Sequence, residues 1–203
     1  MVHSGRVALR ARQESDVAVL HAELYEDVEM RSRADSRPWR PVPAGSSESP
    51  FAVADPSDDE AVFSVVEVAD GSPAGGSPTG GEVAAGELAG EALLWSIDTH
   101  NRSAHIGVSL RPAYRGRGLG TDVVRALCGY GFRVRGLHRL QIETLTDNVA
   151  MVRAAIRAGF TREGTLRRSA WVDGGFLDEA VLGLLVSEWD MAVGGSVLDR
   201  SPS

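Results

Sequence analysis

The sequence predicts an α+β fold, a mixed α/β arrangement in which one mixed sheet is combined with helices. Three observations carry this prediction. Strand-like and helical segments alternate irregularly along the chain, the 203 residues suit one domain or two small ones, and 43% of them are hydrophobic. That hydrophobic fraction is enough for a buried core, so wholesale disorder is disfavoured.

Hydrophobic periodicity assigns the elements in order. Strands are expected at 6–10, 61–68, 86–98, 104–110, 137–145, 161–172 and 176–186, with the turn Asp173-Gly174-Gly175 between the last two. Helices are expected at 16–31, 120–135 and 148–158, with Ser15 as an N-cap and with Val28, Val149 and Ile156 in the apolar stripes. We expect a single domain over residues 1–190, a flexible loop at 70–85 and a disordered tail at 191–203.

The tryptophans, the cysteine and the histidines lie outside any recognisable motif, and a structural role is the first interpretation for each of them. Trp95, in the middle of a predicted strand, and Trp189 are interpreted as packing residues, and so is Trp39, although it could also line a pocket from its loop. Cys128, beside the apolar stripe of a helix, is interpreted as a small buried hydrophobic residue. The histidines lack partners at ligand spacing, so no metal site is proposed.

The chain contains no lysine, because all 21 basic residues are arginine. This excludes a Walker A loop, a protein-kinase site and Schiff-base chemistry, each of which needs a lysine. The one cysteine excludes an intrachain disulfide and fits a reducing compartment. Residues 1–16 lack the apolar run of a secretory signal, and the longest apolar run, 180–186, is too short for a membrane span. We therefore expect a cytoplasmic protein without a membrane partner.

Charge is distributed unevenly within a net charge of −7. Residues 41–100 hold eleven acidic side chains and no arginine, whereas residues 101–170 hold thirteen arginines and four acidic side chains. A basic segment inside an acidic protein favours a local anionic ligand over bulk nucleic-acid binding, although arginines on solvated helix faces would give the same pattern.

A glycine-rich loop lies between the strand 104–110 and the helix that follows it. Residues 116, 118 and 120 are glycine, so backbone N–H groups can approach an anion closely, and the helix start adds unpaired N–H groups. Together these groups predict a phosphate site that needs no lysine, with Arg115 and Arg117 at its rim. A dinucleotide fingerprint fits poorly, because position 121 is Thr and no βαβ unit precedes the loop.

The run Arg115-Gly116-Arg117-Gly118-Leu119-Gly120 resembles the acyl-coenzyme A pyrophosphate loop of the GNAT superfamily of N-acyltransferases. Downstream landmarks agree: Asn148, the pair Gly159-Phe160, the run 162–167 and the pair Glu188-Trp189 are similar to the branch that includes the ribosomal-protein alanine N-acetyltransferases. The resemblance is strong over residues 86–190 and weaker before them. It implies a mostly antiparallel sheet of about seven strands, flanked by helices.

The resemblance also implies a site for acetyl-CoA as co-substrate, in a cleft where the strand 104–110 splays from the strand 137–145. The pantetheine arm would pair with the backbone of Val108, Ser109 and Leu110, and an N–H near Val108 would polarise the thioester carbonyl. The pyrophosphate would contact the loop and helix start, made up of Arg115, Gly116, Arg117, Gly118, Leu119, Gly120 and Thr121. Asn148 would bind the pantetheine end.

The sequence leaves several candidates open for the catalytic acid and base. Relatives often read Asn-x-x-Ser, with the hydroxyl as acid toward the leaving thiolate, but the fourth position here is Met151. Thr144, Thr146, Tyr114 or Tyr130 could take over, or the thiolate could leave unprotonated. The candidate bases are His105, Glu143 and Glu91, and Glu143 should lie on the face opposite Ile142.

The resulting hypothesis is an acyl-CoA dependent N-acetyltransferase that moves acetyl to a primary amine by direct attack in a ternary complex. The acceptor would be a protein N-terminus or a small-molecule amine, without nucleic acid or metal, and the protein would be a monomer or homodimer. The alternative is a catalytically silent acyl-CoA binding or sensor module, which Met151 favours.

Overall fold

One mixed sheet organises the chain in the computed structural model, which describes residues 1–35, 37–68 and 86–192. Its strands follow the spatial order β1-β2-β3-β4-β5-β6-β8-β7. They are β1 (Val2–Ser4), β2 (Val7–Arg10), β3 (Ala61–Glu67), β4 (Glu87–Asp98), β5 (Ser103–Leu110), β6 (Arg139–Leu145), β7 (Thr161–Val172) and β8 (Gly175–Leu185). The helices are α1 (Glu14–Leu24), α2 (Val28–Ala34), α3 (Leu119–Gly129), α4 (Val149–Arg157) and α5 (Val186–Ala192).

Every neighbouring pair of strands is antiparallel except β5 and β6, which run parallel. Their pairing covers only three residue pairs, from Ser103↔Arg139 to His105↔Gln141, and ends there. Beyond His105, β5 remains paired with β4 while β6 remains paired with β8. The sheet therefore opens between β5 and β6, as predicted, and the mixed, mostly antiparallel class is confirmed.

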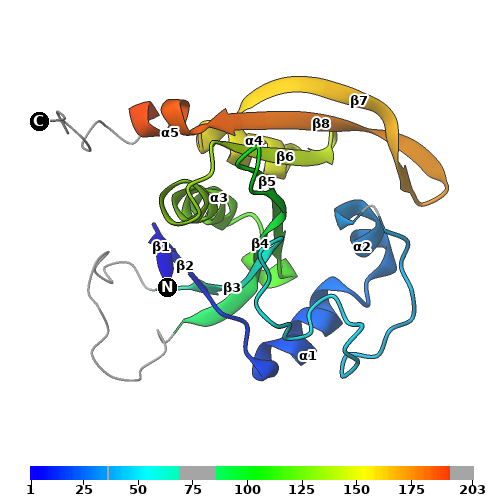
Figure 1. Cartoon of the computed structure of the whole chain (residues 1–203). Coiled ribbons are helices and arrows are strands. Elements are labelled where there is room, and N and C mark those ends of the chain that lie inside the picture. Colours follow the sequence, from blue (N-terminus) through cyan, green and yellow to red (C-terminus); the bar gives the residue numbers. More distant parts are fainter. Residues whose placement is uncertain (36, 69–85, 193–203) are drawn as a thin grey trace, which may run out of the picture.

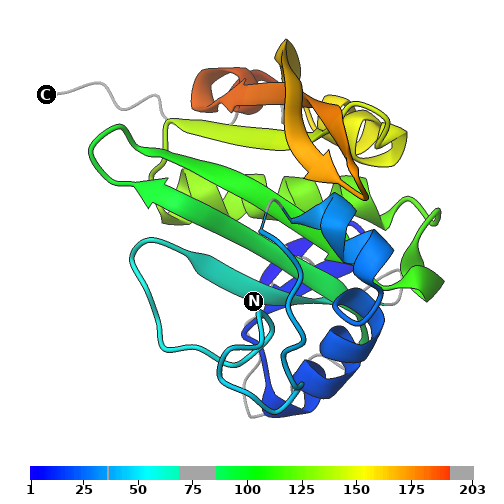
Figure 2. The ribbon, with the colours of Figure 1, turned by 90° about the vertical axis from the view of Figure 1, so that its right-hand side faces the viewer.

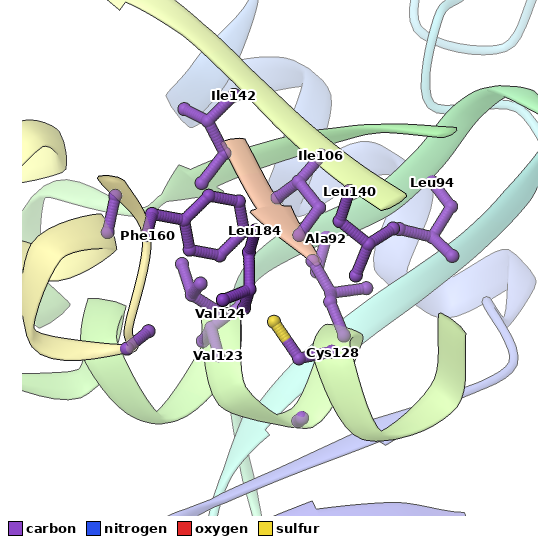
Figure 3. Packing of buried hydrophobic residues seen from close by; sticks show 14 of the residues in the cluster. Ala92, Leu94, Ile106, Val123, Val124, Cys128, Leu140, Ile142, Phe160 and Leu184 are labelled. Atoms are coloured by element: carbon purple, nitrogen blue, oxygen red, sulfur yellow. The ribbon is translucent and has the colours of Figure 1, made fainter. Parts of the chain in front are cut away.

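Helices cover both faces of the sheet, with α3 on one side and α1 and α2 on the other (Figure 1 and Figure 2). The main core lies under α3, where Val123, Val124 and Cys128 meet Leu140 and other sheet residues (Figure 3). A smaller cluster of Leu20, Leu24, Tyr25 and Phe51 packs on the opposite side, beneath α1. The two clusters fix the sheet between the helices and leave its α2-facing side, near the opening, partly exposed.

The buried aromatic and sulfur residues follow the sequence interpretation in three of four cases. Trp189 is buried against Phe132, and Trp39 packs near Tyr25 and donates a hydrogen bond from its ring N–H to the Tyr25 carbonyl at 2.9 Å. Cys128 is fully buried, and this burial raises the pKa of its thiol to about 12. Trp95 is the exception, because 41% of it is exposed.

The predicted helix 16–31 is wrong as one element, since α1 and α2 are separate. Gln13, not Ser15, caps α1, and the Asp27 side chain accepts a hydrogen bond from the Met30 N–H and starts α2. This second cap redirects the chain after α1, and Val28 becomes exposed.

Four smaller expectations also need correction. The sheet has eight strands among the described residues instead of about seven, because β1 is an addition. The predicted helix 120–135 ends at Gly129 and continues as a π-helical turn, Tyr130–Val134. Val149 and Ile156 are exposed, because the buried positions of α4 are Ala154 and Ala155. Helix α5 reaches Ala192, two residues into the predicted tail. The predicted loop at 70–85 and the rest of the tail lie outside the described residues.

Asp16 joins the start of α1 to two strands. Its buried carboxylate accepts hydrogen bonds from Arg10 at 2.6 and 2.8 Å, from Ser64 Oγ at 2.7 Å and from the Gln13 N–H at 2.9 Å. Burial alone would raise the pKa of Asp16, but these hydrogen bonds outweigh burial and hold the pKa below its ordinary value of 3.8.

Asp16→Asn should lower the free energy of unfolding by about 3 kcal/mol at neutral pH, measured by urea titration, because Arg10 loses its buried partner. A carboxyl whose pKa is lowered by folding stabilises the protein above its unfolded pKa and loses that effect as pH falls through the folded value. The difference between wild type and variant should therefore shrink below about pH 3.8. Asp55→Asn, at an exposed position, is the control. A difference that stays constant into strong acid would contradict this account.

Candidate active site

The glycine loop that joins β5 to α3 has the backbone of an anion cradle. Gly116 and Gly118 adopt φ of +70° and +85°, which other residues adopt only with strain, and Gly118 is the N-cap of α3. A Cβ at position 116 would meet nothing within 4 Å, so the surface over Gly116 is open, whereas the Arg6 side chain lies against the loop at Gly118 and donates to the Arg117 carbonyl. The N–H groups of Leu119, Gly120 and Thr121 lie in the first turn of α3, where no intrahelical partner is available. These residues suit the pyrophosphate of coenzyme A.

The two arginines of this loop are both held by the protein. Arg115 donates from Nε to the Leu110 carbonyl at 2.8 Å, which ties the loop to the end of β5. Arg117 pairs with Glu67 at 2.8 Å and lies 5.4 Å from the Tyr114 ring centroid. Glu67 also lies 3.9 Å from Arg6 Nη1, so one carboxylate faces two guanidinium groups at this loop.

The C-terminal half of β5 presents a backbone edge toward the opening of the sheet. Val108, Ser109 and Leu110 pair with β4 on one side, and no described strand pairs with them on the other. All three residues are half-buried. An extended ligand could add to this edge as a further strand would, which is a recurring mode of recognition.

Asn148 and the candidate acids occupy separate positions. Asn148 caps α4, where Oδ1 accepts from the Met151 N–H at 3.2 Å and Nδ2 donates to Thr144 Oγ1 at 3.0 Å. Tyr114 donates its hydroxyl to Glu87 at 2.8 Å, and Tyr130 packs edge-on against Phe63. Of the candidate acids, Thr144 is therefore the one that contacts Asn148, whereas the Tyr114 hydroxyl is bound to Glu87.

His105 and Glu143 come together on the face of the sheet that is turned toward α2. His105 Nδ1 lies 4.0 Å from Glu143 Oε1, and both side chains are about 30% exposed. Nδ1 is buried and makes no hydrogen bond to the described residues. The alternation with buried Ile142 placed Glu143 on the correct face, but sequence alone could not place it beside His105, because the two strands pair in parallel from distant parts of the chain.

Trp95 is a site residue that the sequence interpretation missed. It pairs directly with His105 across β4 and β5, and the two ring centroids lie 4.4 Å apart with an interplanar angle of 36°. The alternation of side chains along a strand could have predicted its exposure, since the neighbouring Leu94 is fully buried and Trp95 must point to the opposite face of the sheet. Trp95 forms an exposed wall beside the imidazole.

Glu91, the third candidate base, is buried in an ion pair with Arg12 and is not accessible to a substrate. Arg12 Nη2 donates to Glu91 Oε2 at 2.6 Å, and both side chains are nearly inaccessible to solvent. Burial raises the pKa of the Glu91 carboxyl, and the Arg12 guanidinium opposes this shift without cancelling it. The Nε and Nη1 atoms of Arg12 are buried without a partner among the described residues, so Arg12 depends on Glu91 for compensation of its charge.

Residues 6–161 match the family model of the acetyltransferase (GNAT) domain. The chain therefore belongs to the GNAT acetyltransferase domain family, and the resemblance seen in the sequence is confirmed.

Relatives agree with this assignment. The chain is 33% identical over 84 residues to Probable N-acetyltransferase YjcK of Bacillus subtilis, a match that covers 41% of this chain and 46% of YjcK. It is 25% identical over 96 residues to spermidine N(1)-acetyltransferase of Vibrio cholerae, covering 47% of this chain and 56% of that protein. The chain thus spans about half the length of these curated relatives.

The fold is also that of solved acetyltransferases. The crystal structure of Vibrio cholerae spermidine N-acetyltransferase in complex with CoA and spermine superposes with a TM-score of 0.74 at 21% identity, covering 91% of this chain and 98% of that one. No helix in the described ranges is long and apolar enough to cross a membrane. Among the same residues, no group of three or more His, Cys, Asp or Glu side chains could hold a metal ion.

Glu91→Leu should lower the free energy of unfolding by about 4 kcal/mol, because it leaves Arg12 as an unpaired buried charge. The double variant Arg12→Met/Glu91→Leu should recover most of that loss, since it removes both charges. Urea titration of the single and double variants tests this. If Glu91→Leu were as stable as wild type, the ion pair would not have the structural role assigned to it.

Proposed function

We propose that this protein transfers acetyl from acetyl-CoA to a primary amine by direct attack within a ternary complex. The observation that carries the proposal is the path along one strand. Strand β5 (Ser103–Leu110) carries His105 near its start. Beyond His105 no described strand pairs with its second edge, where Arg115 occupies the Leu110 carbonyl, and the strand leads into the glycine loop at the start of α3. An anion cradle, a strand edge without a strand partner and the His105 imidazole thereby follow one another in the order in which acetyl-CoA would need them.

The chain's own residues would bind the donor by its backbone. The N–H groups from Gly116 to Thr121 would hold the pyrophosphate, and the edge at Val108, Ser109 and Leu110 would orient the pantetheine arm. An N–H near Val108 would stabilise negative charge on the thioester oxygen. Asn148, with one amide hydrogen beyond its bond to Thr144, could bind the end of the pantetheine chain.

His105 is the proposed general base. Glu143 lies nearest Nδ1, so the tautomer with hydrogen on Nδ1 leaves Nε2 free to take a proton. The amine nitrogen would lose a proton to Nε2 and form a bond to the carbonyl carbon, and the carbon–sulfur bond would break. Coenzyme A would leave as a thiolate and take up a proton, which Thr144 could supply.

The acceptor is proposed to be a primary amine on a cationic chain, either a small-molecule polyamine or a protein N-terminus. Trp95 supports this class, since an exposed indole face attracts alkylammonium groups, and the Glu143 carboxylate lies on the same face. The similarity to spermidine N-acetyltransferases points in the same direction. A cytoplasmic location and a monomeric or dimeric state remain predictions from the sequence.

His105→Ala should lower kcat by about 100-fold or more, because removal of a general base costs this much, with little change in the KM for acetyl-CoA. The assay is the release of coenzyme A thiol with spermidine, with a peptide that carries a free N-terminus, and with no amine. Unchanged turnover in His105→Ala would exclude it as the base. Binding of acetyl-CoA without turnover on any amine would favour the sensor alternative.

Gly118→Ala should raise the KM for acetyl-CoA at least about tenfold, because a side chain at φ +85° strains the loop and covers its N–H groups. The matched control is Gly129→Ala in the same helix, where a Cβ would meet nothing within 4 Å. This control should leave KM unchanged and stabilise the protein slightly. Equal KM values in the two variants would remove the loop from donor binding.

A further inference from the structure

A chain of polar contacts crosses the sheet behind Glu143. Glu163 on β7 pairs with Arg139 on β6 through two hydrogen bonds of 2.8 and 2.5 Å. Arg139 Nη2 also donates to Gln141 Oε1 at 2.9 Å, and Gln141 Nε2 donates to Glu143 Oε1 at 2.7 Å. That same carboxylate oxygen lies 4.0 Å from His105 Nδ1, so the contacts form a continuous path from β7 to the proposed base.

Two backbone features make room for this path. Glu163 is the extra residue of a β-bulge, between the pairs Arg162↔Leu182 and Gly164↔Val181, and a bulge redirects the side chain of its extra residue. Gly183 on β8 lies between β6 and β7. A Cβ there would stand 2.3 Å from Glu163 Oε1 and 2.7 Å from Arg139 Nη1. The ion pair therefore lies directly over Gly183, where an added Cβ would push the ends of both side chains aside.

The contacts also determine the orientation of the Gln141 amide. Arg139 can only donate hydrogen bonds, so the amide oxygen must face it. The amide nitrogen then faces Glu143, whose carboxylate can only accept. The reverse orientation would place donor against donor and acceptor against acceptor, so the assignment of the two amide ends rests on chemistry as well as geometry.

Stability does not account for this arrangement. The Arg139 and Glu163 side chains are 28% and 41% exposed, and ion pairs exposed to this degree contribute little to the free energy of unfolding. A bulge and a glycine in a sheet both weaken strand pairing. The arrangement is better explained by what it holds in place at its other end.

We propose that Gln141, anchored by the Arg139–Glu163 pair, is a positioning residue that holds the Glu143 carboxylate beside His105. This inference deepens the proposed function and rests on it. Gln141 pairs with His105 in the last register position before β5 and β6 separate, so it stands at the corner of the opening. Without its hydrogen bond, Glu143 can turn toward solvent and away from the imidazole.

Gln141→Met keeps the length of the side chain and removes both hydrogen bonds. It should lower kcat about tenfold, the loss expected when one hydrogen bond to a charged group is removed, with an unchanged KM for acetyl-CoA and little change in stability. The decisive measurement is the double-mutant cycle with Glu143→Ala. In that background Gln141→Met should have no further effect, because the residue acts only through Glu143. An equal loss in both backgrounds would overturn the proposal.

The anchor is tested separately at Glu163. Glu163→Ala should lower kcat about threefold, and the conservative Glu163→Gln, which can still accept a hydrogen bond from Arg139, should restore most of it. Gly183→Ala should resemble Glu163→Ala without removing a polar group. Thr161→Val, at the β7 position that pairs with Gly183, is the matched control and should leave kcat unchanged. If Glu163→Gln lowered kcat as much as Glu163→Ala, the Arg139–Glu163 pair would not anchor Gln141.

A measurement without turnover separates this inference from the proposed function. The side-chain NH₂ resonance of Gln141 can be assigned by NMR from its loss in Gln141→Met. It should lie away from the position of a solvated amide in wild type and should shift toward that position in Glu143→Ala. This NMR outcome is expected even if the protein acetylates no amine. Absence of acetylation would contradict the proposed function and would leave the positioning role of Gln141 intact. A solvated position that Glu143→Ala leaves unchanged would overturn the positioning role.

Discussion

The early end of pairing between β5 and β6 is the constraint on which the rest of the structure depends. Parallel strands normally continue side by side, but here only three residue pairs form before the two strands follow different partners. The separation leaves the end of β5 with a free backbone edge, and it places the glycine loop and α3 beside that edge. Because β6 pairs with β8 and β8 with β7, the β7–β8 hairpin follows β6 away from β5 (Figure 1).

The two sides of the opening are connected by side chains as well as by the sheet. Arg33 on α2 pairs with Asp147, just before α4, at 2.7 Å, although the two residues are far apart in sequence. On the sheet itself, the path from Glu163 on β7 through β6 to Glu143 links these two strands to His105 on β5. The geometry of the candidate site is therefore a property of contacts between distant segments, which local sequence patterns do not record.

This explains what the sequence could predict. The glycine loop, the class of the sheet and the opening were accessible, because glycine spacing and alternation are local signals and the family resemblance supplied the topology. The break after α1 was missed because Asp27 competes as a cap within a run of helical spacing. Trp95 was misread because four consecutive apolar residues hide an alternation that only the paired strands reveal. The approach of Glu143 to His105 needed the register of a parallel pair, which no local pattern encodes.

The burial of Cys128 has a practical consequence for experiments on this protein. Its thiol is the only one in the sequence, it lies under the sheet, and it is protonated at any ordinary pH. Thiol reagents will therefore leave the folded wild-type protein unlabelled, and a cysteine introduced at the exposed Phe176 near the hairpin turn would be the single reactive position. The chain also contains no lysine, so no side-chain amine in these 203 residues can become a target of self-acetylation. A fluorophore or spin label can thus be attached to the hairpin after this one substitution, without first removing a native cysteine.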